Sequence, residues 1–364
     1  MENVVVNMAR REIDQFTVPR KVSKIRWLEG SVFPQKNLHF ATALHVDGKV
    51  DTLTIWSCEN QRQFEIMRAE DVKAGFNPKQ LAEISHRGEV LDMRVIDDQE
   101  PLLVTASSLG EINLYKSKIQ ADSSTLQHVA THRHHGFPNL GVAGATSLSI
   151  RPQALNEIAS VGEDSRLVLI GSDNIQKTLQ RSDRVSSGLS AVCWRSSSSI
   201  AVATKSGQVR LFDRRDISKS VSPVLQDPRQ LDPLTCIAQH PTDVHKLTTG
   251  NDEGAVSIWD VRNMSKPEVK AIKVHNSIVW EVMFHPNQPD KLISSSQDGT
   301  LATVNWKQAL NEYVSDATGT KDEYIATYWS SITNVLSVNS IDYHNRANIL
   351  LAGADSGGIL HSVQ

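Results

Sequence analysis

The chain has 364 residues, and its 38 lysines and arginines against 41 aspartates and glutamates give a net charge of -3. This balance gives the whole molecule no attraction towards nucleic acid or anionic membranes, so we expect no direct nucleic-acid partner. The longest run without a charged residue, Tyr324–Ile341, is rich in serine, threonine and asparagine, and we expect no membrane insertion. The cysteines Cys58, Cys193 and Cys236 show no paired spacing and are expected to be reduced, as in a cytosolic or nuclear protein.

In chain order, the sequence contains seven copies of one strand pattern. In each copy a turn residue precedes a strand that is apolar on both faces, as a sheet sandwiched between two neighbouring sheets requires. The seven turn positions are Asp51, Gly110, Ser165, Gly207, Gly254, Gly299 and Gly357.

The fifth and sixth copies repeat each other without a gap, 45 residues apart. Their shared anchors are His240-Pro241, Lys246-Leu247 and Gly254 in one copy and His285-Pro286, Lys291-Leu292 and Gly299 in the next. The third strand of the fifth copy ends in Trp259-Asp260. A period of about 40–45 residues that closes on Trp-Asp is the signature of a β-propeller blade of the WD type.

The last copy ends at Gln364 without a fourth strand, whereas a spare strand-like segment lies around Gln15–Pro19. In a closed propeller the N-terminal strand completes the last blade and removes the exposed sheet edges. We therefore predict an all-β protein, a single seven-bladed WD40-type β-propeller domain over residues 1–364, closed by an N-terminal strand.

A strong WD repeat joins a loop histidine, a strand serine or threonine, a turn aspartate and the tryptophan by hydrogen bonds. We expect His275, Ser296 and Asp298 to form three members of such a set, with Val304 in place of the tryptophan. Since the sets are incomplete, the blades are expected to depend mainly on apolar packing.

The sequence contains no phosphate-binding loop, zinc-protease helix or nucleophile elbow. The best metal candidate is His132-Arg133-His134-His135, with His128 upstream, but neighbouring histidines on a strand diverge whereas zinc requires converging ligands. The run Ser196–Ser199 is interpreted as a hairpin tip. We predict a protein that is not an enzyme, with no catalytic residue, no cofactor and no metal.

Two insertions between repeat units, at about 59–84 and 307–333, are the candidate binding elements. The second holds a high share of the aromatic residues, a class enriched at interface hot spots. These residues are Tyr313, Tyr324, Tyr328 and Trp329. We take them as the preferred partner contact; the alternative is that they pack the insertion onto the propeller edge.

A second motif supports an alternative function. Trp259, Asp260 and Arg262 form a Trp-Asp-x-Arg sequence. It looks like the pattern by which some WD-repeat proteins dock the propeller adaptor of cullin-RING ubiquitin ligases. The alternative is therefore a substrate receptor of such a ligase.

Several longer blocks resemble one family of WD-repeat nucleoporins, nucleoporin forty-three of the outer-ring, Y-shaped scaffold complex. They are Ser23-Lys24-Ile25-Arg26-Trp27, Phe40-Ala41-Thr42, His86-Arg87-Gly88-Glu89-Val90-Leu91-Asp92, Trp280-Glu281-Val282-Met283-Phe284-His285-Pro286-Asn287 and Leu336-Ser337-Val338-Asn339-Ser340-Ile341-Asp342.

The resemblance implies a non-enzymatic scaffold subunit that binds other nucleoporins, especially helical-solenoid subunits, as a monomeric propeller within a hetero-oligomer. It also implies location in the nucleus, at the nuclear envelope and nuclear pore complex, and support of nucleocytoplasmic transport of protein and mRNA. A role at the kinetochore in mitosis belongs to the same set of implications.

Overall fold

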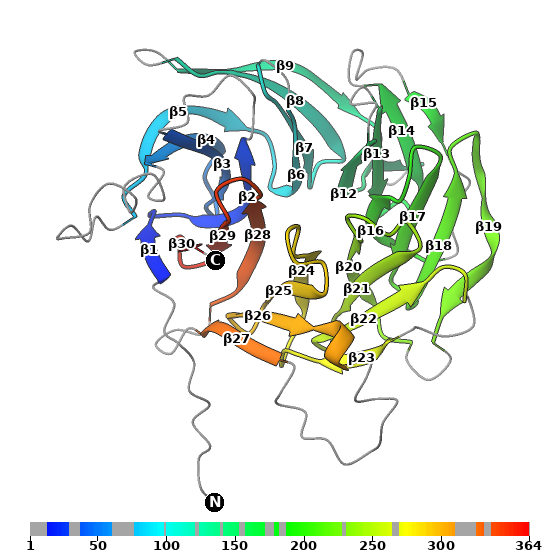
Figure 1. Ribbon diagram of the computed structural model, residues 1–364. Coiled ribbons are helices and arrows are strands. Elements are labelled where there is room, and N and C mark those ends of the chain that lie inside the picture. The colour runs from blue at the N-terminus through cyan, green and yellow to red at the C-terminus, as the bar shows by residue number, and fades with distance from the viewer. Residues whose placement is uncertain are drawn as a thin grey trace, which may run out of the picture.

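The computed structural model describes residues 13–28, 37–59, 76–97, 100–120, 124–138, 141–152, 157–171, 178–181, 187–227, 231–263, 269–309, 325–330 and 336–363. In these ranges the chain forms seven four-stranded antiparallel sheets, arranged as blades around a central axis (Figure 1). The predicted seven-bladed β-propeller is thereby confirmed.

Each blade follows the chain from the innermost strand outwards, except where the two ends meet. Blade 1 is β2 (Lys21–Leu28), β3 (Asn37–His45), β4 (Asp51–Glu59) and β5 (Lys79–His86); blade 2 is β6 (Val90–Ile96), β7 (Leu102–Ser107), β8 (Glu111–Lys118) and β9 (Thr125–Arg133); blade 3 is β12 (Ala145–Ile150), β13 (Glu157–Gly162), β14 (Leu167–Gly171) and β15 (Thr178–Arg181). Blade 4 is β16 (Leu189–Trp194), β17 (Ser199–Thr204), β18 (Gln208–Asp213) and β19 (Asp216–Gln226); blade 5 is β20 (Leu234–Gln239), β21 (Lys246–Asn251), β22 (Ala255–Asp260) and β23 (Val269–Lys273); blade 6 is β24 (Val279–Phe284), β25 (Lys291–Ser296), β26 (Thr300–Asn305) and β27 (Ile325–Ser330). Blade 7 is β28 (Val338–His344), β29 (Ile349–Ala354), β30 (Gly358–Val363) and β1 (Ile13–Thr17), and a short hairpin of β10 (Gly136–Phe137) and β11 (Gly141–Val142) precedes blade 3.

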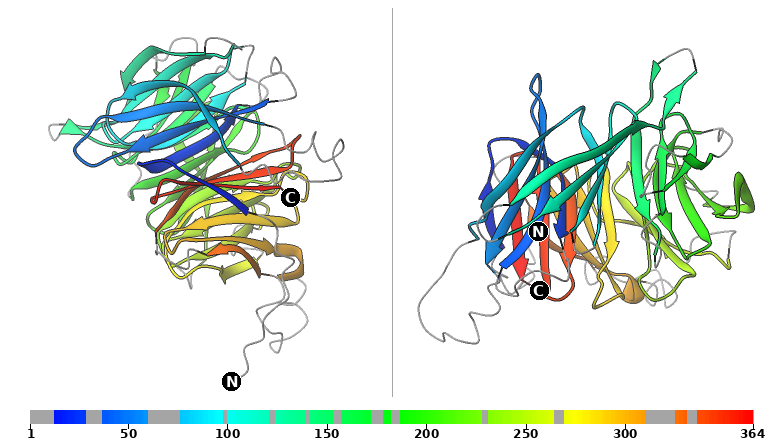
Figure 2. Two further views of the ribbon diagram at one scale, coloured as in Figure 1. Left: turned by 90° about the vertical axis from the view of Figure 1, so that its left-hand side faces the viewer. Right: turned by 90° about the horizontal axis from the view of Figure 1, so that it is seen from above.

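The ring closes through β1, as the sequence predicts. β1 pairs antiparallel with β30, from Ile13 opposite Ser362 to Thr17 opposite Gly358. Figure 1 shows these strands, from opposite ends of the chain, side by side, and Figure 2 shows the blades stacked beside one another in two further views. The Val18 amide continues the ladder by donating to the Gly357 carbonyl at 2.9 Å.

Apolar packing between blades forms the core. Among the described residues, seven clusters of buried side chains occur, and each lies between two neighbouring blades around the ring. Pairs that represent the interfaces in ring order are Leu53 with Met93, Val104 with Ile158, Val161 with Val192, Leu211 with Leu234, Val256 with Val282, Ile293 with Ile341, and Ile349 with Val22. Because apolar burial is the dominant favourable contribution to folding, these interfaces hold the blades together.

The turn positions predicted from the sequence precede or begin the third strand of every blade. Ser165 adopts a φ of 61°, in the left-handed region that the glycines at the equivalent turns of the other blades also adopt. Blade 1 differs: Asp51 already lies in β4, and the positive φ of 73° belongs to Gly48, three residues earlier.

The hydrogen-bonded set in blade 6 differs from the prediction at two places. His275 Nε2 lies 2.7 Å from Ser294 Oγ. Its Nδ1 lies 2.5 Å from Thr300 Oγ1, which donates to Asp298 Oδ1 at 2.5 Å, so Thr300 stands between the histidine and the aspartate. Ser296 instead donates to the Ser277 carbonyl, because its side chain lies two residues further along β25 towards the turn.

Each predicted insertion runs into the fourth strand of its blade. In the range 59–84, residues 60–75 lie outside the described part, Phe76 is buried against Phe40, and β5 begins at Lys79. In the range 307–333, residues 310–324 and 331–333 lie outside the described part, and Ile325–Ser330 form β27. The described parts of both candidate binding elements therefore belong to, or directly precede, the outermost strands β5 and β27.

Replacing Gly357 by alanine tests the closure. A Cβ atom there collides with the Val18 carbonyl oxygen at a φ of +76°, whereas a Cβ at Gly48, with a φ of +73°, has nothing within 4 Å. We expect Gly48→Ala to lower the free energy of unfolding by about 1–2 kcal/mol and Gly357→Ala by about 2–5 kcal/mol. Urea unfolding of the two variants measures both values, and equal losses would contradict the tight contact of Val18 with the last turn.

Candidate protein-interaction site

The seven innermost strands share one local geometry. Each carries a register shift, a β-bulge, one residue after its first core position. The two alternate residues after the bulge therefore occupy equivalent places on every blade, and on five blades both of them line the central cavity. In order from blade 1 to blade 7 these pairs are Lys24 and Arg26, Asp92 and Arg94, Ser147 and Ser149, Ala191 and Cys193, Cys236 and Ala238, Glu281 and Met283, and Ser340 and Asp342.

These positions divide the channel into two unlike halves. Blades 6, 7, 1 and 2 place charged side chains there, whereas blades 3, 4 and 5 place only serine, alanine and cysteine. The charged half contains the place where β1 closes the ring.

The Arg26 side chain is the centre of the charged half. Its guanidinium lies 2.8 Å from Glu281 Oε1 and 3.4 Å from Asp92 Oδ1, and the side chain is only 6 % exposed. It also donates to the carbonyls of Met93 and Ile341 at 2.8 and 3.2 Å. One side chain of blade 1 thus contacts blades 2, 6 and 7.

Glu281 forms ion pairs with Arg26 and with a second cation, Lys24. Its Oε1 accepts from Lys24 Nζ at 2.8 Å, and its Oε2 accepts from the Ile341 amide at 2.8 Å. Burial by itself raises the pKa of a carboxyl group, but Arg26 and Lys24 hold the pKa of Glu281 far below its usual range. Burial also opposes the charge of Arg26, yet its acidic neighbours raise its pKa.

Two further carboxylates join neighbouring blades through backbone amides. Asp92 Oδ2 accepts from the Leu148 amide at 2.8 Å, which links blade 2 to blade 3. Asp342 Oδ2 accepts from the Trp27 amide at 2.7 Å, which links blade 7 to blade 1. Burial raises the pKa of Asp342 to about 6, despite the opposing effect of Arg26.

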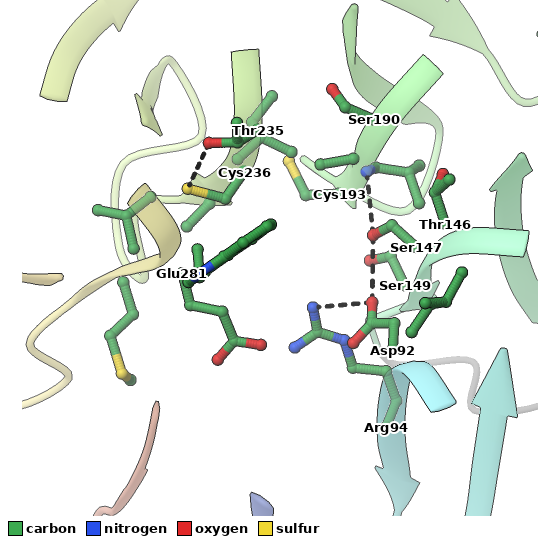
Figure 3. Close-up of a pocket in the computed structure, with 18 of the residues that line it drawn as sticks. Asp92, Arg94, Thr146, Ser147, Ser149, Ser190, Cys193, Thr235, Cys236 and Glu281 are labelled. Carbon is green, nitrogen blue, oxygen red and sulfur yellow. Dashed lines mark hydrogen bonds and ion pairs between the residues drawn. The ribbon is translucent and has the colours of Figure 1, made fainter. Parts of the chain in front are cut away.

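The small side chains of the other half leave space. A cavity of about 710 Å³ occupies the channel, and Figure 3 shows Cys193 and Cys236 on one side of it and Glu281, Asp92 and Arg94 on the other. Both thiols are buried and free, and burial raises the pKa of each to about 12.

The aromatic residues predicted as a partner contact are placed only in part. Tyr313 and Tyr324 lie outside the described residues, and Tyr328 and Trp329 lie on β27. In the β-ladder Trp329 stands opposite Leu301 of β26. β27 is the outermost strand of blade 6, so these two residues belong to the circumference of the propeller.

The Trp-Asp-x-Arg sequence at Trp259, Asp260 and Arg262 ends in a compact turn. Trp259 is buried and donates from Nε1 to Thr249 Oγ1 at 2.8 Å, so it is part of the blade packing. Asp260 accepts from Arg262 Nε at 2.9 Å, while 63 % of the Arg262 side chain is exposed. Asp213 and Arg215 repeat this arrangement in blade 4, with Nε 3.0 Å from Oδ1.

The histidine cluster does not form a metal site. Within the described ranges, no three histidine, cysteine, aspartate or glutamate side chains converge to hold a metal ion. His135 is buried and bonds Asp164 Oδ1 at 2.8 Å and Ser160 Oγ at 2.9 Å, as the loop histidine of a WD-type set does. His132 and His134 have ring centroids 4.8 Å apart.

The described part of the chain forms no helix with the length and apolarity to cross a bilayer.

The channel residues are functional candidates that no sequence motif identifies. Their signal in the sequence is that ionisable residues such as Arg26, Asp92 and Glu281 interrupt otherwise apolar innermost strands. All three lie in the segments that resemble the nucleoporin family. These residues form one site only in the closed ring, which brings Arg26 and Glu281 together although they are 255 residues apart in sequence.

Comparisons with known proteins agree with this fold. The family model of the Vps8 beta-propeller matches residues 172–317. Nucleoporin Nup43 of mouse and of human are each 32 % identical over 295 residues, covering 78 % of this chain and 73 % of theirs. Nuclear pore complex protein nup43 of Dictyostelium discoideum is 28 % identical over 42 % of this chain and 36 % of its own.

Removal of Arg26 tests the ionic network. Arg26→Met leaves Glu281 and Asp92 buried without their main cation, so we expect a loss of about 3–5 kcal/mol in the free energy of unfolding. The exposed Arg87→Met is the control and should change stability little. The double variant Arg26→Met with Glu281→Met should be less destabilised than Arg26→Met alone; a double variant as unstable as the sum of the single changes would contradict the pairing.

The raised pKa of Asp342 predicts a specific pH dependence. The folded protein binds this proton up to about pH 6, whereas the unfolded chain releases it near pH 3.8, so stability falls as pH rises through this window. Asp342→Asn removes this loss, and its stability relative to the unsubstituted protein should rise by about 2–3 kcal/mol between pH 4 and pH 7. Urea unfolding across this pH range measures the difference, and parallel curves would rule out a buried, titrating Asp342.

Proposed function

This chain belongs to the Nup43 family of nucleoporins, and from that premise we propose that it is a non-enzymatic scaffold subunit of the nuclear pore outer-ring complex. It is a WD-repeat propeller that presents fixed surfaces to other proteins. The observation that carries the proposal is the similarity to the mouse and human nucleoporins across 78 % of the chain, on a ring that closes on itself.

The completeness of the ring limits how a partner binds. All seven sheets have four strands, and β1 fills the last place in blade 7. A partner therefore has no missing strand to supply and must bind at a face, a loop or the outer edge of a blade. Each of these modes presents a preformed surface, which reduces the ordering cost of association.

For the partners, we propose other outer-ring nucleoporins, especially helical-solenoid subunits, with the propeller as a single copy within a hetero-oligomer. The location that follows is the nuclear pore complex at the nuclear envelope. Support of nucleocytoplasmic transport, including mRNA, and a mitotic role at the kinetochore belong to the same proposal. The relatives named as nucleoporins support this choice.

The proposed contact is the outer edge of blade 6. β27 pairs with β26 on one side and with no described strand on the other, so its outer backbone edge is available within the described structure. Tyr328 and Trp329 lie on this strand, and Tyr313 and Tyr324 precede it in the sequence. Aromatic side chains contribute disproportionately to binding energy at interfaces.

A second candidate function is a substrate receptor of a cullin-RING ubiquitin ligase. The observation that favours it is the guanidinium of Arg262, which Asp260 orients at the end of β22 and which remains 63 % exposed. Trp259 would act only through the blade packing, since it is buried.

Co-purification with tagged variants distinguishes these functions. We expect Tyr328→Ala with Trp329→Ala to reduce the recovered outer-ring nucleoporins at least roughly tenfold, because each hot-spot aromatic contributes about 2 kcal/mol or more. Arg262→Ala should leave them unchanged, as should Arg215→Ala, which removes the equivalent arginine of blade 4. Quantitative mass spectrometry of the purified material provides the measurement.

Two outcomes would decide against parts of the proposal. Retention of nucleoporins by the double aromatic variant removes the β27 contact but leaves the scaffold function intact. Recovery of a cullin with its propeller adaptor, lost in Arg262→Ala but kept in Arg215→Ala, would replace the scaffold function by the ligase receptor.

A further inference from the structure

The central cavity reaches the first residues of the innermost strands, on the side of the turns that precede the third strands. Lys205, in the turn between β17 and β18, lines it there and is exposed. Trp280, at the bulge of β24, also lines it and is 39 % exposed. The equivalent bulge residue in blade 5, Thr235, instead donates its hydroxyl to the Val279 carbonyl. An exposed indole beside a cavity is therefore a specific feature of blade 6.

The carboxylates that line the cavity already accept two or more hydrogen bonds each. Asp92 accepts from the Leu148 amide and from Ser147 Oγ at 3.1 Å, in addition to Arg26. Glu281 accepts from Lys24, Arg26, Ser340 and the Ile341 amide. Asp342 accepts from the amides of Trp27 and Tyr343. These carboxylates are therefore already engaged within the protein, and Glu281 and Asp92 are paired with cations.

The cations of the cavity differ, because two of them keep donors for a ligand. Arg94 donates from Nε to the Leu148 carbonyl at 3.1 Å and from one terminal nitrogen to Asp92 Oδ2 at 3.4 Å, and 39 % of its side chain is exposed. Lys205 adds a second positive charge at the end of the cavity beside the turn between β17 and β18. Figure 3 shows the Arg94 guanidinium beside Asp92 and directed into the cavity.

The wall opposite Arg94 consists of small and largely apolar side chains. It is formed by Ala191, Cys193, Cys236 and Ala238 of blades 4 and 5. Figure 3 shows the two thiols across the cavity from the Asp92–Arg94 pair. A space of about 710 Å³ with one charged and one apolar wall is large enough for several side chains of a polypeptide segment.

We propose that this cavity binds an acidic segment of a partner polypeptide, with an aspartate or glutamate carboxylate on Arg94 and a neighbouring apolar side chain against Ala191, Cys193 and Ala238. Lys205 attracts the segment at the mouth, and Trp280 packs against the chain where it enters. The guanidinium offers two parallel donors, which matches the geometry of a carboxylate. This site is separate from β27 and does not rest on the nuclear pore role.

The test uses the full chain and short random peptides displayed on phage. Peptides selected on the immobilised protein are synthesised with a fluorescent label, and their dissociation constants are measured by fluorescence polarisation. Three protein variants are compared: Arg94→Gln removes the proposed anion contact, Ala238→Met fills the apolar wall, and Arg215→Gln is the control at the opposite end of blade 4. Each selected peptide is also made with its acidic residue replaced by the corresponding amide.

We expect the selected peptides to carry aspartate or glutamate beside an apolar residue. Arg94→Gln, or the acid-to-amide change in the peptide, should weaken binding at least roughly tenfold, and the two changes together should weaken it little further. Ala238→Met should also weaken binding, while Arg215→Gln should not. The second protein variant keeps the test valid if Arg94→Gln does not fold.

Three results would overturn the proposal. They are the failure to select any peptide, the selection of basic or neutral peptides, and the selection of acidic peptides whose affinity is unchanged by both Arg94→Gln and Ala238→Met.

Discussion

The buried guanidinium of Arg26 is the interaction on which the closed ring depends. A charge that is 6 % exposed is stable only when carboxylates and carbonyls surround it, and these groups come from blades 2, 6 and 7. The same part of the ring holds β1 against β30. Chain closure therefore combines a strand pairing at the circumference with an ionic network at the axis. Loss of either arrangement leaves buried polar groups without partners, so opening the ring is costly.

The placement of this network also explains the cavity. Seven equivalent pairs of positions face the axis, and long charged side chains fill the part belonging to blades 6, 7, 1 and 2. Serine, alanine and cysteine on blades 3, 4 and 5 are too short to fill the remainder. The axis is thus asymmetric although the blades are similar. The described propeller therefore offers two kinds of surface. One is the circumference, formed by the outermost strands of the blades, and the other is the cavity at the axis with its charged half.

The sequence predicts the fold because repetition and alternation of apolar residues act locally. The seven turn positions, the strand after each turn and the closing segment around Gln15–Pro19 all follow from patterns within single blades. The adaptor-like turn at Asp260 and Arg262 is also local.

The Arg26 network is not predicted, because Glu281 lies 255 residues away and only the closed ring brings the two side chains together. The pattern predicts Ser296 for the blade 6 set, whereas the structure has Ser294, because two alternate serines of one strand face the same side. Partner surfaces are the hardest to predict, because aromatic content alone does not distinguish contact residues from packing residues.

The central claim is that the closed ring serves as a nuclear pore scaffold. The most direct measurement is to image the fluorescently tagged chain, expressed at its natural level, in living interphase cells together with a marked outer-ring nucleoporin. The account predicts a rim at the nuclear envelope in which the two signals coincide pore by pore, with slow exchange after photobleaching. A diffuse nuclear or cytoplasmic signal, or rapid exchange at the rim, would contradict a scaffold role.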